Sequence, residues 1–330
     1  MTKRKLIFDV DTGTDDAVAL MLGLLSKEFE VLGICSVNGN RPIDYTTENT
    51  LRVLDYIGAR DIPVYKGAAL PLVSTLMKGR RDNVPITEEL GDMKNTFYLP
   101  LPETDLKYEE TPASIWLVNT LKNAKEKITI VAVGPLTNLA LALRMDPTIV
   151  NNVEELIIMG GGHLETNCNL SSEFNIWIDP EAAKIVFECG LKITVFPLDA
   201  THAACIDYDD CDDLDKLDTP AAKATSVFTR MRIDGYDRKE TMSVIHSAPI
   251  HDALCVAYMI NPDVAPIMKE GYCEVGILPG VGDGDTVFDF RYVARRGLKP
   301  NCKVALTANR DLFASILKER LAFKYTKKGE

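Results

Sequence analysis

The sequence has no long apolar run. The start, MTKRKLIFDVD, is basic but lacks the apolar stretch of about 7 to 15 residues that a secretion signal needs. No uncharged apolar segment reaches the roughly 18 residues expected of a membrane helix. We therefore expect a cytoplasmic protein without a membrane partner.

Positive charge is also in deficit. The 330 residues include 37 Lys and Arg against 48 Asp and Glu, which gives a net charge of −11. Nucleic acids and anionic membranes attract basic patches. This balance argues against a nucleic-acid partner and favours a small-molecule ligand.

Cysteine pairs are missing as well. The 8 cysteines are scattered, with no C-x-x-C pair. Cysteines with this distribution are typical of small buried side chains in a reducing compartment. They indicate neither a zinc site nor a disulfide framework.

What the sequence does contain is an alternation of β-rich runs and helical patterns. Expected strands at 6–10, 30–37, 127–133 and 154–160 are followed by expected helices at 15–27, 46–58, 136–145 and 179–190, and a strand at 191–197 closes the series. This order predicts an α/β fold in one large domain, residues 1–330, with a central, mostly parallel sheet flanked by helices.

Two segments interrupt that alternation. Residues 72–110 are poorly periodic and rich in Gly, Pro and charge, so we expect a loop excursion near the mouth of a site or at a partner surface. Residues 206–260 form a more helical stretch near the site. A β-rich piece at 272–306 then precedes a last helix at 311–322.

Four carboxylates crowd together after the first expected strand. Asp9 and Asp11 project to the same face of an extended segment, while Asp15 and Asp16 begin a helix, where one of them could serve only as a cap. Like charges in one site raise one another's pKa, so something positive should lie among them. Their hard oxygen atoms suit Ca²⁺ or Mg²⁺.

Other polar segments fall at the ends of neighbouring strands. VNGN (37–40), GPLTN (134–138) and MGGG (159–162) each follow an expected strand, as the Asp cluster does. Ligands of open α/β sheets bind beyond the carboxyl ends of the strands. The four segments therefore point to one site.

Two hydrolase families open with acidic motifs of this type. Haloacid dehalogenase-like phosphatases use D-x-D-x-T/V, but Gly13 stands here where Thr or Val is required. The D-x-D-x-G-x-D-D opening of the nucleoside hydrolases is matched residue for residue. Later blocks follow in the same order as in that family, namely SVNGN, VGPLTNLALAL, IIMGGG, N-x5-E-F-N with IDPEAA, PIHDALCVAY, TVFDFRY and KVALTANRDLF. The chain resembles the inosine-uridine preferring nucleoside hydrolases.

That resemblance implies a Ca²⁺-dependent enzyme of nucleoside salvage that hydrolyses the N-glycosidic bond of ribonucleosides to ribose and free base. The ion would be bound by Asp11, Asp16, Asp252 and the backbone carbonyl of Val133. Asp11 would also be the general base for a water held by the ion, and Asp9 would stand behind these ligands. The family's usual assembly implies a homodimer or homotetramer.

Substrate contacts are implied in the same way. Asp15 and Asn40 would bind the 2′- and 3′-hydroxyls, and Met159 would lie under the ribose. The remaining hydroxyls would be reached by Asn167, Glu173 and Asn175.

For the leaving base, His251 is the expected general acid, because an unperturbed imidazole titrates near neutrality. Tyr236 and His246 are its expected companions in the base pocket. No His occurs before Tyr98, in contrast to the His-rich loop of some family members. Arg80, Arg81 and Asp82 either replace the base contacts of that loop or are solvated.

Several residues have structural alternatives. EFNIWIDP could be a strand entering a helix, with Asp179 as N-cap and Pro180 as the first helical residue, although this would not explain Glu173 and Asn175. Asn138 is expected to be a turn or helix-start residue. A magnesium-dependent phosphohydrolase of the haloacid dehalogenase type, and a non-catalytic nucleoside- or ribose-binding protein, stay open as alternative functions.

Overall fold

The computed structural model describes residues 3–81, 97–239, 242, 244–291 and 298–327. Nine strands build its central sheet. In chain order these are β1 (Arg4–Val10), β2 (Phe29–Ser36), β3 (Val64–Lys66), β4 (Ile128–Ala132), β5 (Val153–Met159), β6 (Ile193–Phe196), β9 (Met268–Val275), β10 (Thr286–Asp289) and β11 (Cys302–Ala305).

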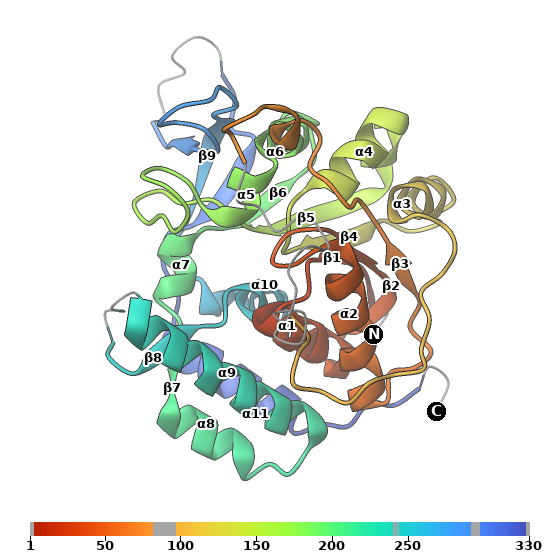
Figure 1. Ribbon diagram of the computed structural model, residues 1–330, viewed down its shortest axis with the longest axis vertical. Helices are drawn as coiled ribbons and strands as arrows, with labels where there is room; N and C mark the ends of the chain where they lie inside the picture. Colours follow the sequence, from red (N-terminus) through yellow and green to blue (C-terminus); the bar gives the residue numbers. More distant parts are fainter. Residues whose placement is uncertain (1–2, 82–96, 240–241, 243, 292–297, 328–330) are drawn as a thin grey trace.

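The sheet is mixed but mostly parallel, which confirms the predicted fold class. Its strand order is β10-β9-β11-β6-β5-β4-β1-β2-β3. Figure 1 labels the strands from β9 to β3 other than β11. Neighbours from β3 to β11 pair in parallel, whereas β9 is antiparallel to β11 and β10 is antiparallel to β9. The carboxyl ends of β2, β1, β4 and β5 therefore lie next to one another.

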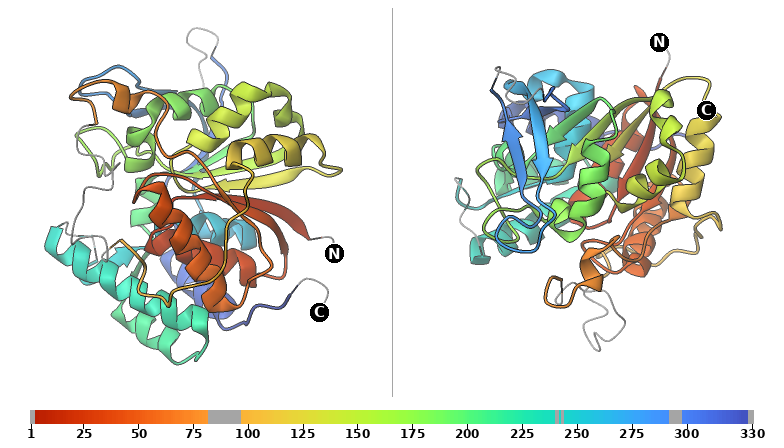
Figure 2. Two further views of the ribbon diagram at one scale, coloured as in Figure 1. Left: turned by 45° about the vertical axis from the view of Figure 1, so that its right-hand side comes forward. Right: turned by 90° about the horizontal axis from the view of Figure 1, so that it is seen from above.

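Helices cover both faces of the sheet (Figure 2). On one face lie α1 (Thr14–Leu25), α2 (Ile43–Ile57), α10 (His251–Ile260) and α11 (Arg310–Leu321), and on the other α3 (Ala113–Lys122), α4 (Thr137–Met145) and α6 (Pro180–Phe187). Successive side chains of β1 point to opposite faces of the sheet and so contribute to both hydrophobic cores. Leu6, Phe8 and Val10 belong to one core, and Ile7 belongs to the other.

The remaining elements are short, apart from one long helix. They are η1 (Ser74–Leu76), η3 (Pro147–Asn152), α5 (Phe174–Ile178), α7 (Leu198–His202), β7 (Cys205–Asp207), α8 (Tyr208–Asp215), α9 (Pro220–Lys239), β8 (Ser247–Pro249) and η4 (Pro262–Val264). β7 and β8 pair in a separate two-stranded sheet, and α9 packs against α1. Within the described part of the chain, no helix combines the length and the apolar character needed to cross a membrane.

The EFNIWIDP segment corrects one of the alternatives. Phe174–Ile178 is a short helix, not a strand, because the Glu173 carboxylate accepts the N–H groups of Asn175 and Ile176 and so caps its start. The second half of that alternative is confirmed. Asp179 accepts the Ala182 N–H as N-cap of α6, and Pro180 is its first residue.

Candidate active site

The polar segments singled out in the sequence converge at one edge of the sheet. Asp11 directly follows β1, Asn40 follows β2, Val133 directly follows β4, and Met159 ends β5. Because these four strands are neighbours and parallel, their carboxyl ends place the four residues together.

A cavity of about 320 Å³ opens at this edge. Its lining includes Val133 and all eight residues expected to contact substrate. The lining residues are Asp15, Asn40, Val133, Met159, Asn167, Cys168, Glu173, Phe174, Asn175, Arg232, Tyr236, His251 and Asp252. Asp11 and Asp16 are fully buried behind this lining.

Three buried carboxylates form a tight group beside the cavity. Asp15, Asp16 and Asp252 each offer an oxygen within 4.8 Å of the other two. Asp15 and Asp16 start α1, and Asp252 starts α10, which packs against α1. Burial, followed by the charge of Asp15, raises the pKa of Asp16 to about 7 and that of Asp252 well above its usual range.

Asp11 lies next to this group and is cradled by glycines. Its Oδ2 accepts the Asn40 N–H at 2.6 Å, whereas its buried Oδ1 has no hydrogen-bond partner. Any Cβ at Gly39 would collide with Oδ2, and one at Gly134 would lie 2.9 Å from Oδ1. Burial and then the charge of Asp16 raise the pKa of Asp11 well above its usual range.

These donors fit a hard divalent cation. Carboxylate and carbonyl oxygens are the ligands that such ions take, and the unpartnered Oδ1 of Asp11 is a buried acceptor that a cation would satisfy. The group of three contains Asp15, which the sequence assigned to ribose, and does not contain Asp11. The Val133 carbonyl already accepts the Asn175 Nδ2–H at 2.8 Å, which leaves one lone pair for a further ligand.

Capping explains part of the Asp16 position. Its two carboxylate oxygens accept the Asp11 N–H at 3.1 Å and the Gly13 N–H at 2.9 Å. Asp16 is thus a helix-start residue and also a member of the three-carboxylate group, so the two roles proposed for it do not compete.

Asp9 is buried behind the residues that line the cavity. It is 1% exposed and is absent from the cavity lining. Its Oδ1 accepts Asn138 Nδ2–H at 2.8 Å, and Asn138 also bonds Ser36 O and Ala68 N–H. Burial raises the pKa of Asp9 to about 7. Asn138 therefore ties β1, β2 and α4 together, as expected of a helix-start residue.

α5 and the residue before it supply further buried polar groups to the cavity. Glu173 Oε2 accepts the Gly161 N–H and its Oε1 accepts the Asn175 N–H, both at 2.9 Å. Burial raises the pKa of Glu173 to about 7. Asn167 Oδ1 accepts the Phe174 N–H at 3.0 Å, which ties the preceding loop to the start of α5.

A chain of three hydrogen-bonded polar side chains reaches the cavity at Tyr236 and His251. Tyr236 Oη lies 2.9 Å from His251 Nε2, and His251 Nδ1 lies 2.7 Å from Thr201 Oγ1. Burial, then the charge of Arg232, lowers the pKa of His251 well below its usual value. The imidazole is therefore neutral at neutral pH. His246 is exposed, pairs with Asp237, and does not line the cavity.

Sequence reasoning missed three lining residues, Arg232, Cys168 and Phe174. Arg232 is part of the positive charge expected among the carboxylates, because its Nη1 lies 3.0 Å from Asp15 Oδ1. Its Nε donates to Pro249 O at 2.8 Å. One signal could have found it, since Arg232 precedes Tyr236 by one helical turn on α9 and so shares its face.

A comparison with known families decides the identity. Residues 6–315 match the model of the inosine-uridine preferring nucleoside hydrolases. The chain belongs to this family. That membership favours a nucleoside hydrolase over both the phosphohydrolase and the non-catalytic binding protein.

Relatives of this nucleoside hydrolase include enzymes with different base preferences. A pyrimidine-specific ribonucleoside hydrolase, RihA, from Citrobacter koseri is 34% identical over 96% of this chain and 98% of its own length. A plant nucleoside hydrolase, PpNRh1, superposes with a TM-score of 0.84 at 31% identity, covering 97% of this chain and 99% of its own. A purine-preferring ribonucleoside hydrolase from Gardnerella vaginalis superposes with a TM-score of 0.83 at 27% identity, covering 97% of this chain and 98% of its own.

Arg80 and Arg81 of the hydrolase are neither solvated nor part of the cavity lining. Their side chains are 3% and 2% exposed, and both pair with Asp283. The expectation of base contacts or solvation at these two residues is therefore wrong, because a buried carboxylate from a distant turn neutralises them. Asp82 lies outside the described residues.

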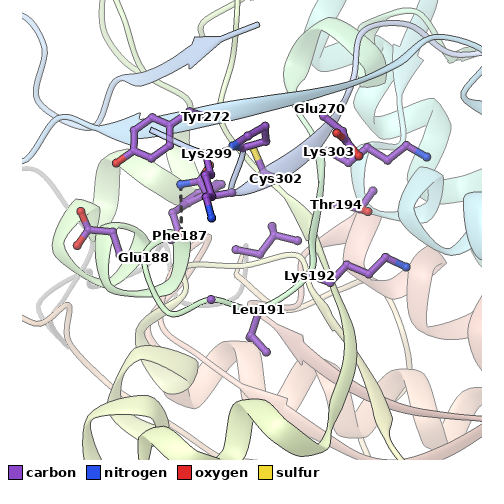
Figure 3. A pocket seen from close by; sticks show the side chains of 14 residues that line it. Phe187, Glu188, Leu191, Lys192, Thr194, Glu270, Tyr272, Lys299, Cys302 and Lys303 are labelled. Atoms are coloured by element: carbon purple, nitrogen blue, oxygen red, sulfur yellow. Dashed lines mark hydrogen bonds between the residues drawn. The ribbon is translucent and has the colours of Figure 1, made fainter. Parts of the chain in front are cut away.

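A larger hollow of about 760 Å³ lies elsewhere, between the end of α6 and strands β6, β9 and β11 (Figure 3). Lys192, Lys299 and Lys303 line it together with Glu188 and Glu270. None of the predicted site residues lines this hollow. Its open, mixed-charge surface lacks the buried carboxylates that mark the smaller cavity.

Proposed function

We propose that this hydrolase cleaves the N-glycosidic bond of ribonucleosides to ribose and free base in a calcium-dependent reaction, with Asp11 as the general base. One observation carries the proposal. The buried Asp11 Oδ1 lacks a hydrogen-bond partner while lying next to three further buried carboxylates at the wall of a ligand-sized cavity.

We propose that Asp11, Asp16, Asp252 and the Val133 carbonyl hold the ion. Asp15 is close enough to Asp16 and Asp252 to share it. When bound, calcium would lower the pKa of a water molecule and offset the charge of the surrounding carboxylates. Four hard oxygen donors within one buried site support calcium over a softer metal.

Asp11 then takes the proton from the attacking water. Its Oδ2 is held by the Asn40 N–H and its Oδ1 is left free, so one oxygen can be fixed while the other receives the proton. The transition state of N-glycoside cleavage has oxocarbenium character. An ionised carboxylate near the ribose stabilises that positive charge.

The ribose lies, in this proposal, between α1 and α5. Asp15 and Asn40 bind the 2′- and 3′-hydroxyls, and Asn167, Glu173 and Asn175 bind the remaining hydroxyl. Met159 contacts the sugar from the end of β5 with a polarizable thioether. All six residues line the same cavity.

The leaving base faces Tyr236 and His251. We propose that His251 acts with Tyr236 to protonate the leaving base. In this step the Tyr236 O–H gives its proton to the base, and the Nε2–H of the neutral His251 stabilises the phenolate that is left, while His251 Nδ1 accepts the Thr201 hydroxyl proton in a hydrogen bond. Solvent returns the proton to Tyr236 after the base has left. General acid catalysis of this kind contributes about 10²–10⁴-fold.

A substrate panel tests the proposal. Ribose release is measured from uridine, cytidine, inosine and adenosine, each with calcium and with excess chelator. We expect release from at least one nucleoside, lost with chelator and restored by calcium. Full release in chelator would contradict the calcium dependence, and no release from any nucleoside would contradict the activity.

We also propose that residues 1–330 form one domain and that the hydrolase is a homodimer or homotetramer. Light scattering coupled to size-exclusion chromatography measures the assembly directly. A monomer at micromolar concentration would contradict it. Single-step unfolding in denaturant would support one domain, and two separated transitions would not.

A further inference from the structure

A strap of residues 72–81 runs alongside the segment that carries Glu173 and Asn175. Leu72 N–H donates to Asp179 Oδ2 at 2.9 Å, and Ser74 Oγ donates to Ile178 O at 2.7 Å. At the end of the strap, Arg81 Nε donates to Trp177 O at 2.7 Å. The strap is thus hydrogen-bonded along the end of α5 and the start of α6.

The strap is fixed by a buried charged cluster. Arg80 binds Asp283 through two nitrogens, at 2.9 and 2.8 Å, and its third nitrogen lies 2.6 Å from Glu181. Arg81 lies 2.8 Å from the same Asp283, and its guanidinium stacks over Trp177 at 4.0 Å. Two guanidinium groups face two carboxylates, so the cluster is balanced in charge.

The same cluster holds the other end of the site segment. The carbonyl of Asp283 accepts Ser172 Oγ–H at 2.8 Å and Asn169 Nδ2–H at 3.2 Å. Ser172 directly precedes Glu173, and Trp177 follows Asn175 by two positions. The cluster is therefore hydrogen-bonded to both ends of the segment 172–177.

Stability alone gives a poor account of this arrangement. Burying ion pairs costs desolvation energy, and well-packed apolar residues often serve stability equally well. Forked guanidinium contacts instead fix geometry. Neither arginine nor Asp283 lines the cavity, so the cluster acts on the site through α5 and the residues that precede it.

We propose that Arg80, Arg81 and Asp283 are positioning residues that hold Glu173 and Asn175 in register with the ribose 5′-hydroxyl. The inference rests on the proposed function, in which these two residues bind the hydroxyl left after Asp15 and Asn40 have bound the other two. It makes discrimination for the 5′-hydroxyl depend on residues outside the cavity.

The test compares the nucleoside that the wild type cleaves fastest with its 5′-deoxy analogue. Arg81→Lys keeps the charge but loses the fork, so kcat/KM for the parent nucleoside should fall about tenfold or more while that for the analogue falls less than about threefold. Ser172→Ala leaves the buried charges intact. It should also lower the ratio of kcat/KM for the parent nucleoside to kcat/KM for the analogue, by a smaller factor than Arg81→Lys does. Arg60→Lys, at an exposed ion pair with Asp55, is the matched control and should change neither.

A double-mutant cycle separates positioning from a general structural effect. In an Asn175→Ala background, Arg81→Lys should cause no further loss for the parent nucleoside. Equal losses on both substrates, or losses that add fully in the cycle, would overturn the inference while ribose release by the wild type stood. If the wild type released no ribose from any nucleoside, the proposed function would fail and the inference with it.

Discussion

Two buried charged regions lie next to α5, and they differ in how their charges are balanced. In the cluster of Arg80, Arg81, Asp283 and Glu181, each carboxylate has a guanidinium within 2.8 Å. At the cavity there are five buried carboxylates, and among the described residues they share one ion pair, Arg232–Asp15 at 3.0 Å. The five are Asp11, Asp15, Asp16, Glu173 and Asp252.

The pKa shifts follow the same division. In the balanced cluster the two arginines lower the pKa of Asp283, although burial opposes them. At the cavity, burial and mutual repulsion raise the pKa values of Asp11, Asp16 and Asp252. The charges of the balanced cluster offset one another, whereas the unbalanced group of carboxylates requires protons or a cation.

The largest effect is expected at the centre of the unbalanced region. Asp16→Ala removes a shared ligand and should abolish ribose release. It should also remove the rise in melting temperature on adding calcium, because binding to the native state stabilises by RT ln(1 + [L]/Kd). Thermal scans with and without calcium measure this. Asp283→Asn, as the control, should keep the calcium-dependent rise in melting temperature. An Asp16→Ala protein that still responded to calcium would contradict the ligand assignment.

Asp11→Asn should have the second-largest effect. The amide keeps the shape and an oxygen for the ion but cannot accept the proton from water, so kcat should fall about 10³-fold or more on every nucleoside while substrate still binds. Steady-state kinetics and a binding assay separate the two effects. A fall in kcat of less than tenfold would leave Asp11 as a ligand only.

His251→Ala tests the base end of the cavity. Natural nucleosides leave poorly without protonation, so their hydrolysis should slow by about 10²-fold, whereas p-nitrophenyl riboside, with its good leaving group, should be barely affected. Parallel rates on the two substrates give the answer. Equal losses would make His251 a support for Asp252 or the ribose instead.

The same type of substitution, Asp→Asn, should change the free energy of unfolding in opposite directions in the two regions. In chelator at pH 8, Asp252→Asn removes a buried charge whose pKa is raised in the folded state, and should increase the free energy of unfolding. Asp283→Asn breaks a buried pair and should lower it by about 3 kcal/mol.

The direction for Asp252 follows from proton binding. A raised folded-state pKa means that the folded protein holds the proton more tightly, so stability is lost as pH rises from the unfolded toward the folded pKa. Urea unfolding of the two variants beside the wild type measures both changes. Destabilisation of equal size in both would remove the distinction between the regions.

Local patterns in the sequence were sufficient to predict the parallel core of the sheet and the edge at which the site lies. Strand and helix periodicity located β1, β2, β4, β5 and β6 with their helices, and the rule that ligands lie at the carboxyl ends of strands brought Asp15, Asn40 and Met159 together. Val133, Asn167, Glu173, Asn175 and His251 were predicted from the family resemblance. Short elements escaped this approach. Five-residue α5 and three-residue β3 are too brief to show a period.

Pairings over long sequence separations escaped as well. Arg80 and Arg81 meet Asp283 about 200 positions later, and no local motif marks which carboxylate will neutralise a buried arginine. Arg232 was missed for the same reason, since its partner Asp15 lies at the other end of the chain. The grouping of Asp15 with Asp16 and Asp252 depends on how α1 packs against α10, which spacing alone does not show.

Calorimetric titration of the chelator-treated hydrolase with calcium tests the central claim most directly. If the unbalanced carboxylates form a cation site, the wild type and Asp283→Asn should each bind one calcium ion per chain, and Asp16→Ala should bind none. No binding by the wild type, or undiminished binding by Asp16→Ala, would contradict the claim that these carboxylates hold the ion.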